Sequence, residues 1–476
     1  MSKTVKGGFV KLDGEDFYKI ENYDHMEDFF MTITSSSDVW NFCWSYGGVT
    51  AGRIDREHAI FPYYTADKVS DAKNCTGPYT AVAVKDGDGE MIWEPFASLS
   101  FTAAQRAKAE KGIRRNIYKN LNGTKIWFEE INENLNLSFR YGWTSSQAFG
   151  LVRKSVIQNL GNRDIQLCIL DGAQNIMPAS TTSELQNNNS VLLDAYKKTD
   201  IDTKYNLALF TLSSVLTDKA EPSEGLYANT CWFSTEEKVI VSNEAPIVFA
   251  EDPFNTEKKS ELESLTVLKG KRPSCFIWKN LTLTPSQVNS WYQVFDTTLD
   301  AKKIVGLEHA ISDRSKALAA LEADVDAGEK MMTDIIAQAD GIQDGNAKMT
   351  VAHHRANVMF NIMRGGIFAD NGCIVPSDFI KFISQRNKSK VQDVKSLLVS
   401  MDKDKPCQYT VFKDTIFKSR DRQLQRLFLE YLPITFSRRH GDPSRPWNKF
   451  NIKLQDGEGK PILNYEGNWR DIFQNW

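Results

Sequence analysis

The chain has 476 residues and a nearly balanced charge, with 58 basic against 61 acidic residues and a formal net charge of −3. A surface this close to neutral argues against non-specific binding to nucleic acid, which needs clustered basic residues to displace counterions from phosphates. It gives no reason to expect binding to an anionic membrane surface either, and no run of about 18 apolar residues predicts a membrane span.

Length and residue usage indicate a globular protein of two or three domains. Its 11 Trp, 15 Tyr and 27 Phe residues could stack on sugar rings, although the ordinary place for aromatic side chains is the core. The seven cysteines include no C-x-x-C pair and are odd in number, which favours reduced thiols over a disulfide framework or a zinc site. Residues 1–12 hold no apolar stretch typical of a signal peptide, which together with the cysteines predicts a cytoplasmic protein. The cysteine pattern also leads us to expect no metal site.

Residues 1–290 show the alternation of β structure. Five large side chains alternate with smaller or polar ones, which places them on one face of a strand, pointing inward: Leu135, Leu137, Phe139, Tyr141 and Trp143. Hairpins are predicted where a polar turn joins two such stretches: residues 125–129 with 135–143, 81–84 with 91–93, and 157–164 with 165–170. Short strands without long helical patterns predict one large antiparallel β-sandwich.

Residues 291–345 change to a helical period. Apolar residues recur at intervals of three, four and seven, as along one face of a helix: Ile304, Leu307, Ile311, Leu318, Leu321, Val325, Met332 and Ile335. Gly328 and Gly341 are the predicted breaks, so we expect one or two helices that link two domains. The stripe either packs on its own chain or pairs with a second copy as a coiled coil, which would make a homodimer.

Residues 346–476 predict helices joined by long loops. Helical patterns cover residues 351–363, 378–385, 391–401 and 422–432, and a loop rich in Pro, Gly, Trp and Arg begins at Ser437. His353 and His354 form a histidine pair, but neighbours on a helix point about 100° apart and make a poor metal clamp. The sequence stops within what reads as the start of a helix, so we expect the natural polypeptide to continue.

A cluster of polar and aromatic residues near the end of the chain could carry chemistry. It comprises Trp469, Arg470, Asp471, Gln474 and Asn475. A guanidinium offers a fork of donors to vicinal hydroxyls or phosphate, a carboxylate accepts from two hydroxyls, and side-chain amides do both. With an indole as a stacking face, this mixture suits a polyhydroxylated ligand whose buried hydroxyls each need a partner. The structural alternative is a salt-bridged helix start with aromatic packing.

The pattern G-x-x-R-D-x-x-Q-N over residues 467–475 resembles the G-Y/F-R-D-x-x-Q-D segment of the cellobiose and chitobiose phosphorylases, in the six-hairpin glycosidase superfamily. In that family a W-L-P-Y-Q-like helix end precedes the segment, and residues 431–435 stand in its place here, reading Tyr431-Leu432-Pro433-Ile434-Thr435. The resemblance implies a large β-supersandwich for residues 1–290, a helical linker for 291–345 and the opening helices of an (α/α)6 catalytic barrel for 346–476.

The resemblance also implies a function: inverting phosphorolysis of a disaccharide or oligosaccharide, with inorganic phosphate as a substrate and no cofactor. Arg470 and Asp471 would bind sugar hydroxyls or phosphate, with Gln474 and Asn475 as supporting contacts. Asn475 stands where the family has an acidic residue, which leaves the sugar and phosphorolysis itself open. The family's general acid lies on a later loop, so we expect the remaining C-terminal part of the protein to supply it and this chain alone to be inactive.

Three alternatives remain open at this point. Aligning residues 467–471 with the family's G-D-W-N-D-like motif, which carries the general acid, would make Asp471 the catalytic acid. An inverting glycoside hydrolase of the same fold would use a second carboxylate to activate water. A non-catalytic sugar-binding or assembly protein would follow if the natural polypeptide ended at residue 476.

Overall fold

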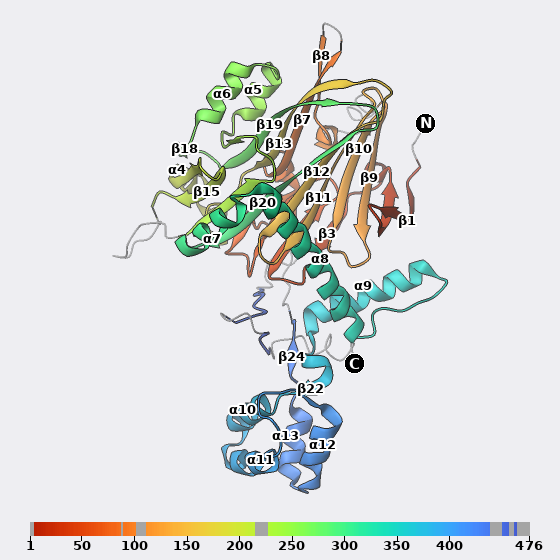
Figure 1. Cartoon of the computed structure of the whole chain (residues 1–476), viewed down its shortest axis with the longest axis vertical. Coiled ribbons are helices and arrows are strands. Elements are labelled where there is room, and N and C mark those ends of the chain that lie inside the picture. The colour runs from red at the N-terminus through yellow and green to blue at the C-terminus, as the bar shows by residue number, and fades with distance from the viewer. Residues whose placement is uncertain are drawn as a thin grey trace. The chain divides into compact units, whose positions relative to one another are not determined.

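The computed structural model describes residues 4–86, 89–100, 111–214, 227–437, 450–456 and 461–463. The chain divides into two compact units (Figure 1). Unit 1 comprises residues 1–332 with 441–450, and unit 2 comprises residues 333–440 with 451–476. The predicted division into residues 1–290, 291–345 and 346–476 stays a prediction.

The larger sheet of unit 1 runs through eleven strands of the described chain, in the order β1-β2-β9-β10-β11-β12-β20-β16-β15-β14-β18, and all neighbours are antiparallel. Their bounds are β1 (Lys6–Leu12), β2 (Glu15–Glu21), β9 (Ile113–Asn120), β10 (Ile126–Asn132), β11 (Leu137–Ser146), β12 (Gly150–Asn159), β14 (Lys197–Asp202), β15 (Leu207–Leu212), β16 (Ala228–Phe233), β18 (Val267–Lys269) and β20 (Val288–Leu299). The inward-facing strand predicted around residue 139 is confirmed: the four predicted residues within β11 are buried, and Leu135, just before it, is partly buried.

Two smaller sheets complete the sandwich. One has the order β17-β19-β13-β7-β8 and the other the order β3-β4-β5-β6. Their bounds are β3 (Phe30–Ile33), β4 (Val39–Trp44), β5 (Val49–Arg53), β6 (Ala59–Phe61), β7 (Gly77–Asp86), β8 (Gly89–Trp93), β13 (Ile165–Gln174), β17 (Val239–Ile240) and β19 (Ser274–Leu283). One cluster of buried apolar side chains draws residues from all three sheets, so the sheets share a core.

Two of the predicted hairpins are confirmed and the third is wrong. β10 pairs with β11, and β7 pairs with β8. β12 and β13, which follow one another in the chain, do not pair: β12 lies between β11 and β20, and β13 lies between β7 and β19. Both strands are buried along nearly their whole length, so their sequences give no alternation that would tie them to one sheet.

Short helices interrupt the strands of unit 1. They are η1 (Tyr23–His25), α1 (Ala66–Asp71), η2 (Ala72–Asn74), η3 (Ala97–Ser100), α3 (Ser183–Asn188), α4 (Ser190–Tyr196), α5 (Ala245–Glu251) and α6 (Thr256–Ser264). Few of them show the long apolar period of an amphipathic helix, because each spans at most nine residues. Capping side chains nevertheless mark the starts of two of these helices. At α3 the Thr182 side chain accepts a hydrogen bond from the backbone N–H of Leu185, and at α6 the Asn255 side chain accepts from those of Glu257 and Lys258.

The helices predicted from the apolar stripe are present as two, α7 (Ala301–Ile311) and α8 (Arg314–Gln338). The break lies at residues 312–313, and the break predicted at Gly328 is wrong because α8 continues through it. Asp313 accounts for the position, since its carboxylate accepts a hydrogen bond from the backbone N–H of Lys316 (3.1 Å) and so caps the new helix. At Gly328 a Cβ atom would lie 3.3 Å from the Ser36 hydroxyl, so this glycine permits a close approach of α8 to the sandwich.

The apolar stripe packs on its own chain, as one of the two interpretations predicted. Ile311 and Leu321 are buried in one cluster with side chains of the large sheet, among them Trp232 and Val294. Carboxylates of α8 add polar contacts: Glu322 accepts from the Tyr292 hydroxyl (2.8 Å), Asp324 accepts from the Ser146 hydroxyl (2.5 Å) and the Ala148 backbone (3.1 Å), and Glu329 accepts from Asn120 (3.2 Å), Asn122 and Thr124. A homodimer stays a prediction.

Unit 2 is mainly helical. Its elements are α9 (Lys348–Gly365), β21 (Ile367–Phe368), η4 (Ala369–Gly372), β22 (Cys373–Ile374), α10 (Pro376–Arg386), η5 (Lys388–Lys390), α11 (Val391–Leu397), β23 (Cys407–Gln408), α12 (Tyr409–Lys418), α13 (Arg422–Glu430) and β24 (Ile434–Thr435). Residues 351–363, 378–385 and most of 422–432 are helical as predicted, whereas α11 ends four residues early and α12 was not predicted. The start of an (α/α)6 barrel stays a prediction.

Residues 368–433 form a small helical module around their own core (Figure 1). The core of this module comprises Ile374, Phe379, Phe382, Ile383, Val394, Leu398, Phe412, Ile416, Leu424, Leu427, Phe428 and Tyr431. Five of these side chains are aromatic, and Phe379 contacts the rings of both Phe412 (centroids 5.2 Å apart) and Phe428 (6.0 Å). The Tyr431 hydroxyl donates to Asp378 at 2.6 Å. The buried ring of Tyr431, in the Leu-Pro segment singled out from the sequence, therefore belongs to the module's core.

Candidate functional site

The sugar-binding residues predicted from the sequence lie outside the described residues. They are Trp469, Arg470, Asp471, Gln474 and Asn475. The same holds for most of the preceding loop, from residue 438 to residue 449. Their arrangement stays a prediction, and the described part of the chain offers two polar cavities in unit 1 instead.

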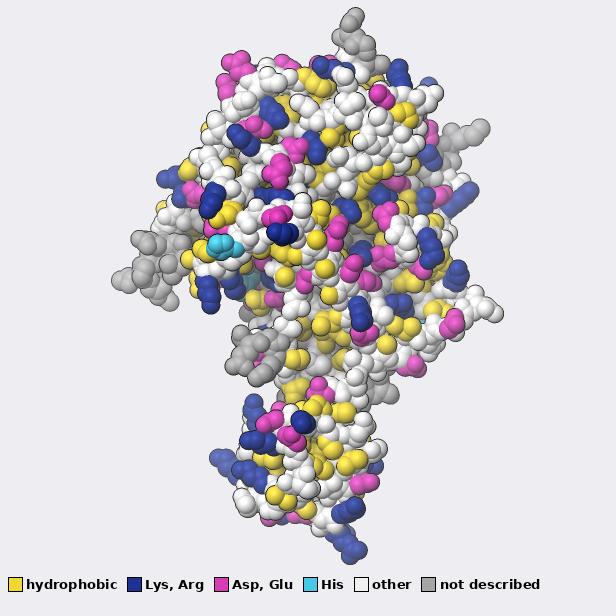
Figure 2. Space-filling view, viewed as in Figure 1, with side chains coloured by type: hydrophobic (Ala, Val, Ile, Leu, Met, Phe, Trp, Pro, Cys, Tyr) yellow, Lys and Arg dark blue, Asp and Glu magenta, His cyan; other side chains and the backbone are white. Residues whose placement is uncertain are grey.

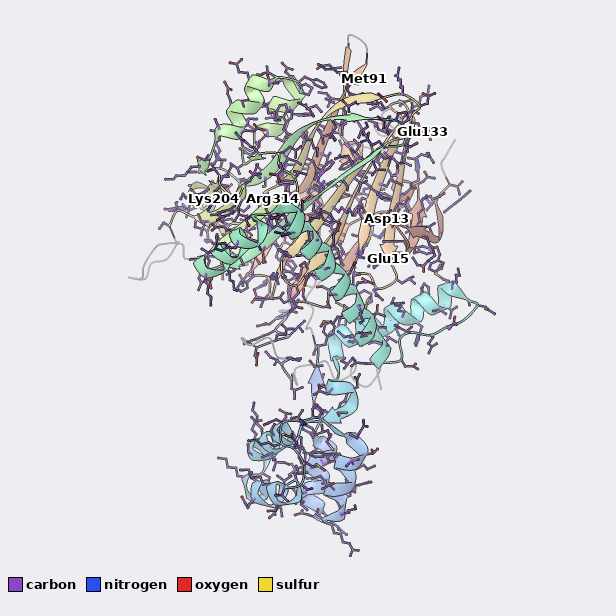
Figure 3. The ribbon with its side chains drawn as sticks, in the orientation of Figure 1. Asp13, Glu15, Met91, Glu133, Lys204 and Arg314 are labelled. Carbon is purple, nitrogen blue, oxygen red and sulfur yellow. The ribbon has the colours of Figure 1, made fainter. Side chains whose placement is uncertain are left out.

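The first cavity, here called the seam cavity, has a volume of about 520 Å³. Its walls are the β1–β2 turn, the outward side of the large sheet and α8: Leu12, Asp13, Gly14, Glu15, Phe17, Lys125, Trp127, Gly142, Trp143, Thr144, Lys154, Tyr292, Glu322, Val325 and Asp326. Figure 3 labels Asp13 and Glu15 at the β1–β2 turn.

Two aromatic rings of the seam cavity, those of Trp127 and Tyr292, already contact cations. The Arg140 guanidinium lies 5.1 Å from the centroid of Trp127, and the Lys154 ammonium lies 4.7 Å from that of Tyr292. Trp127 also lies across Gly142 on the next strand, where a Cβ atom would come within 2.6 Å of the indole. Trp127, which lies between a cation and the backbone, has no free face for stacking on a sugar, and one face of Tyr292 is already taken by a cation.

The charged groups of the seam cavity are largely paired as well. Lys125 donates to Glu15 at 2.8 Å, Arg140 to Asp13 at 3.1 Å, and the Tyr292 hydroxyl to Glu322 at 2.8 Å. Burial lowers the pKa of Lys154, while Glu322 nearby opposes that shift. We therefore interpret the seam cavity as a structural junction between α8 and the sandwich.

The second cavity, here called the edge cavity, has a volume of about 620 Å³. It lies where β5 and β20 end, beside the turn between β11 and β12 and one side of α7. Its walls comprise Asp38, Arg53, Ile54, His58, Gln147, Ala148, Phe149, Asp296, Thr297, Thr298, Leu299, Lys303, Gly306, Leu307 and Ala310. It is the larger of the two cavities, and its charged lining combines carboxylates, a guanidinium, an ammonium group and an imidazole.

Arg53 is the central charged group of the edge cavity. Its Nε and Nη2 atoms donate to the two carboxylate oxygens of Asp296, at 2.6 and 3.3 Å, and its Nη1 atom donates to Asp38 at 2.7 Å. The backbone carbonyl of Gln147 accepts a further bond at 2.9 Å. Burial opposes the charge of the guanidinium, but the carboxylates of Asp296 and Asp38 outweigh it and hold the pKa of Arg53 above its ordinary value. Charge and geometry together fix this group in place.

His58 faces the same cavity from the turn after β5. Its Nδ1 atom lies 2.6 Å from the Asp55 carboxylate. The hydrogen bond to Asp55 raises the pKa of His58, against the effect of burial. Because Asp55 engages Nδ1, the Nε2 atom, for which the described residues supply no hydrogen-bond partner, is the nitrogen left for a ligand.

Two β-branched residues of the edge cavity have left-handed backbone conformations. Ile54 has a φ of 62° and Thr298 a φ of 56°. Such conformations cost on the order of 1–3 kcal/mol each and occur where surrounding contacts impose them. Here the backbone N–H of Ile54 donates to the Asp38 carbonyl (2.9 Å), and that of Thr298 donates to the Asn229 side chain (2.8 Å). The strain is therefore held by hydrogen bonds on both sides of the cavity.

The sequence did not single out the edge cavity. Asp38, Arg53, His58 and Asp296 come from segments up to 258 positions apart, and each is an ordinary charged residue in its own stretch. A weak local signal is the charged run from Arg53 to His58, which interrupts the apolar strands β5 and β6. Nothing in that run identifies Asp296 as the partner of Arg53.

Three further properties of the described residues bear on other kinds of site: the charge distribution, the metal-ligating side chains and the helix hydropathy. On the face shown in Figure 2, basic and acidic side chains are interspersed over both units. Among the described residues, no three His, Cys, Asp or Glu side chains are grouped so that they could hold a metal ion. A search of the same residues finds no helix with the length and apolar content needed to cross a membrane.

One family match is specific to the helical module. Residues 368–433 match the family model described as Glycoside hydrolase family 149 insertion domain 1. The module is therefore similar to a domain that is inserted in proteins of glycoside hydrolase family 149. The narrower resemblance to cellobiose phosphorylases stays a prediction.

Comparison with curated proteins gives no match. Among solved structures, the chain is similar to a bacterial glucoamylase complexed with acarbose (9% identity, TM-score 0.37), covering 92% of this chain and 55% of that one. It is also similar to a GalM/aldose epimerase homologue from C. elegans (8% identity, TM-score 0.32; 57% and 99% covered) and to a protein described as a kojibiose phosphorylase, from the human microbiome (7% identity, TM-score 0.25; 80% and 34% covered). The chain thus spans about half of the glucoamylase and a third of the phosphorylase, and TM-scores this low carry no argument about function.

Proposed function

We propose that the chain is part of an inverting glycoside phosphorylase that acts on a disaccharide or oligosaccharide. The observation that carries the proposal is the match of residues 368–433 to an insertion domain of a glycoside hydrolase family. The G-x-x-R-D-x-x-Q-N pattern at residues 467–475 supports it independently, because the two segments do not overlap. The β-sandwich followed by a helical linker is the order that the resemblance implies.

In this proposal the chain's own residues bind the substrates. Arg470 directs its fork of donors at phosphate or vicinal hydroxyls, and Asp471 accepts from sugar hydroxyls. Gln474 and Asn475 match the remaining hydroxyls. Phosphate attacks the anomeric carbon as the glycosidic bond breaks, and a carboxylic acid from the remaining C-terminal part of the protein protonates the leaving oxygen. No cofactor enters this reaction.

A second candidate is an inverting glycoside hydrolase. It is favoured by the family description of the module match, which names glycoside hydrolases, and by Asn475 in place of the acidic residue expected for the phosphorylases. In that case a carboxylate would activate water where the phosphorylase binds phosphate.

The test uses the 476-residue chain and the full-length protein side by side, with a panel of disaccharides with and without phosphate. Turnover that requires phosphate is the expected result for the full-length protein, and none is expected for the chain alone. Arg470→Ala should weaken substrate binding by about ten- to a hundredfold, as for loss of a charged hydrogen bond. A lower melting temperature with unchanged Michaelis constants would instead assign Arg470 to the fold. Robust turnover by the chain alone that is lost in Asp471→Asn would make Asp471 the catalytic acid.

A further inference from the structure

We propose that the edge cavity is a ligand site in its own right, built from residues of unit 1, which takes a neutral polyhydroxylated molecule the size of a mono- or disaccharide. Neither the proposed reaction nor the residues at 469–475 require such a site. The volume of about 620 Å³ lies within the range of about 300–1,000 Å³ that small-molecule sites occupy.

The polar side of the cavity retains hydrogen-bonding capacity. Arg53 occupies Oδ1 of Asp38, and the Asp38 side chain is 28% exposed, so its second oxygen can accept from a hydroxyl. The Nε2 atom of His58 faces outward from the pair with Asp55. Lys303 is exposed on α7, where the described residues supply no partner for its ammonium group. A carboxylate, an imidazole and an ammonium group together can satisfy both donors and acceptors of a polyol.

The other side of the cavity is apolar. Leu307 and Ala310 of α7, Phe149 and Leu299 line it, and Gly306 leaves a gap in the helix surface, since a Cβ atom there would meet no atom within 4 Å. A pyranose has hydroxyls along its edge and C–H groups on its faces. A cavity with one polar and one apolar side matches that distribution.

Charge balance favours a neutral ligand. The formal charges of the cavity sum to zero: Asp38 and Asp296, both paired with Arg53, carry two negative charges, Arg53 and the exposed Lys303 carry two positive ones, and His58 pairs with Asp55. A ligand with a full charge would leave an unmatched charge in a half-enclosed space, which is costly. Hydroxyl groups impose no such cost.

The site is also rigid before any ligand binds. The carboxylates of Asp296 and Asp38 and the carbonyl of Gln147 hold Arg53. Hydrogen bonds to Asp38 and Asn229 hold the left-handed conformations of Ile54 and Thr298. A preorganised wall reduces the ordering cost of binding. Backbone strain of this kind concentrates at functional sites.

The experiment measures binding of D-glucose and cellobiose to the 476-residue chain by ligand-detected NMR and calorimetry, with glucose 1-phosphate as an anionic probe. Gly306→Leu fills the cavity without touching the Arg53 network and replaces the poorest ordinary helix former with a good one. It should weaken binding of the neutral sugars by at least about tenfold, as should Asp38→Asn, which removes a charged acceptor. Val305→Leu, on the same helix but outside the cavity, should leave binding unchanged.

Several results would overturn the proposal. Neutral-sugar binding that survives Gly306→Leu unchanged would place the ligand elsewhere, and no binding of either sugar would remove the site. Preference for glucose 1-phosphate that disappears in Lys303→Ala would make this an anion site. Binding lost in Asp471→Asn but kept in Gly306→Leu would also overturn it, while supporting the role proposed for residues 469–475. Melting temperatures of all variants show whether each is folded.

Discussion

The β-sandwich and the helical module are held together by different interiors. In the sandwich, the fully buried Asp171 of β13 accepts from both Nη atoms of Arg153 (2.8 and 2.9 Å), from the hydroxyls of Thr80 (2.5 Å) and Ser155 (2.9 Å), and from the indole of Trp291 (2.7 Å). Asp171 and Thr80 belong to the five-stranded sheet. Arg153, Ser155 and Trp291 belong to the eleven-stranded sheet. A single carboxylate thus joins two sheets.

A second buried carboxylate repeats the arrangement. Glu130 of β10 accepts a hydrogen bond from Arg115 on the neighbouring strand at 2.7 Å. It also accepts one from the indole of Trp93, on the five-stranded sheet, at 2.7 Å. Arg115 in turn donates to Asp24 at 3.0 Å. The core of the module, by contrast, consists of aliphatic and aromatic side chains.

The difference shows two ways to specify a fold. A buried ion pair loses hydration and contributes little net stability, but it penalises any arrangement that leaves one partner alone. Such a penalty is useful in a sandwich, where many strands are buried on both faces and their sequences do not specify which sheets pack together. The short helices of the module need only a matched apolar core, and their order along the chain fixes their partners.

The largest effect should come from breaking the ion pair of the sandwich. Asp171→Ala leaves Arg153 charged and buried, together with three unpaired donors. We expect the free energy of unfolding of the sandwich to fall by about 3–5 kcal/mol. Denaturant unfolding followed by tryptophan fluorescence reports chiefly on the sandwich, because eight of the 11 tryptophans lie within residues 40–291 and the module contains none.

Two controls accompany this prediction. Asp13→Ala removes a carboxylate that pairs with Arg140 but is 67% exposed, and should cost less than about 1 kcal/mol. The double variant Asp171→Leu with Arg153→Met should recover much of the loss, since it leaves no charge unpaired. A loss below about 1 kcal/mol in Asp171→Ala would mean that water reaches the site.

A comparable but local effect is expected in the module. Phe379 is fully buried among Phe412, Phe428 and Tyr431. Phe379→Ala should cost about 3–5 kcal/mol within the module, because the cavity left behind adds to the lost transfer energy. Hydrogen exchange over α10 to α13 should accelerate while the tryptophan transition of the sandwich stays in place.

Val399→Ala is the matched control, because Val399 is 83% exposed and its truncation should change stability by at most about 0.5 kcal/mol. Loss of protection in the sandwich as well as the module, in Phe379→Ala, would show that the two cores unfold together and would remove the contrast drawn above.

The smallest effect concerns pH. The hydrogen bond to Asp55 raises the pKa of His58 above its ordinary value of about 6.5. The native state therefore holds this proton more tightly than the unfolded chain, and the stabilisation is fully present below about pH 6.5 and is lost as pH rises through the raised pKa. His58→Gln should lower the melting temperature of the sandwich below that pH and have little effect at higher pH.

The module provides the internal comparison for this titration, since residues 368–433 contain no histidine. Its exchange protection should be the same in His58→Gln and in the parent protein across the range. A difference in the melting temperature of the sandwich that grows toward alkaline pH would have the wrong sign for a raised pKa and would refute the pairing with Asp55.

Sequence patterns predict an element correctly where its own periodicity shows which face is buried. The alternation around Phe139 predicted β11, and the three-four spacing around Leu321 predicted a helix packed on its own chain. The prediction that β12 pairs with β13 was wrong, because strands buried on both faces give no sign of which sheet they join. Glycine favours turns, so the sequence predicts a helix break at Gly328. The capping carboxylate of Asp313 sets the break instead, and Gly328 allows a close contact with Ser36.

The two candidate sites also differ in whether the sequence alone can predict them. The polar cluster at residues 469–475 could be recognised because its members are adjacent in sequence, whereas the structure describes none of them. The edge cavity is the reverse case. Arg53 and Asp296 meet at 2.6 Å across 243 positions, and only the pairing of β20 with the rest of the sandwich brings them together.

The place of β20 also has a consequence for synthesis. Residues 288–299 form the strand that joins β12 to β16, so among the described strands the six on one side are linked by backbone hydrogen bonds to the four on the other through β20. While the ribosome has not yet released this segment, the nascent chain has two exposed strand edges that can pair with other chains. A fragment ending at residue 290 would keep both edges open. We therefore expect the nascent sandwich to be most prone to aggregation before its last strand emerges.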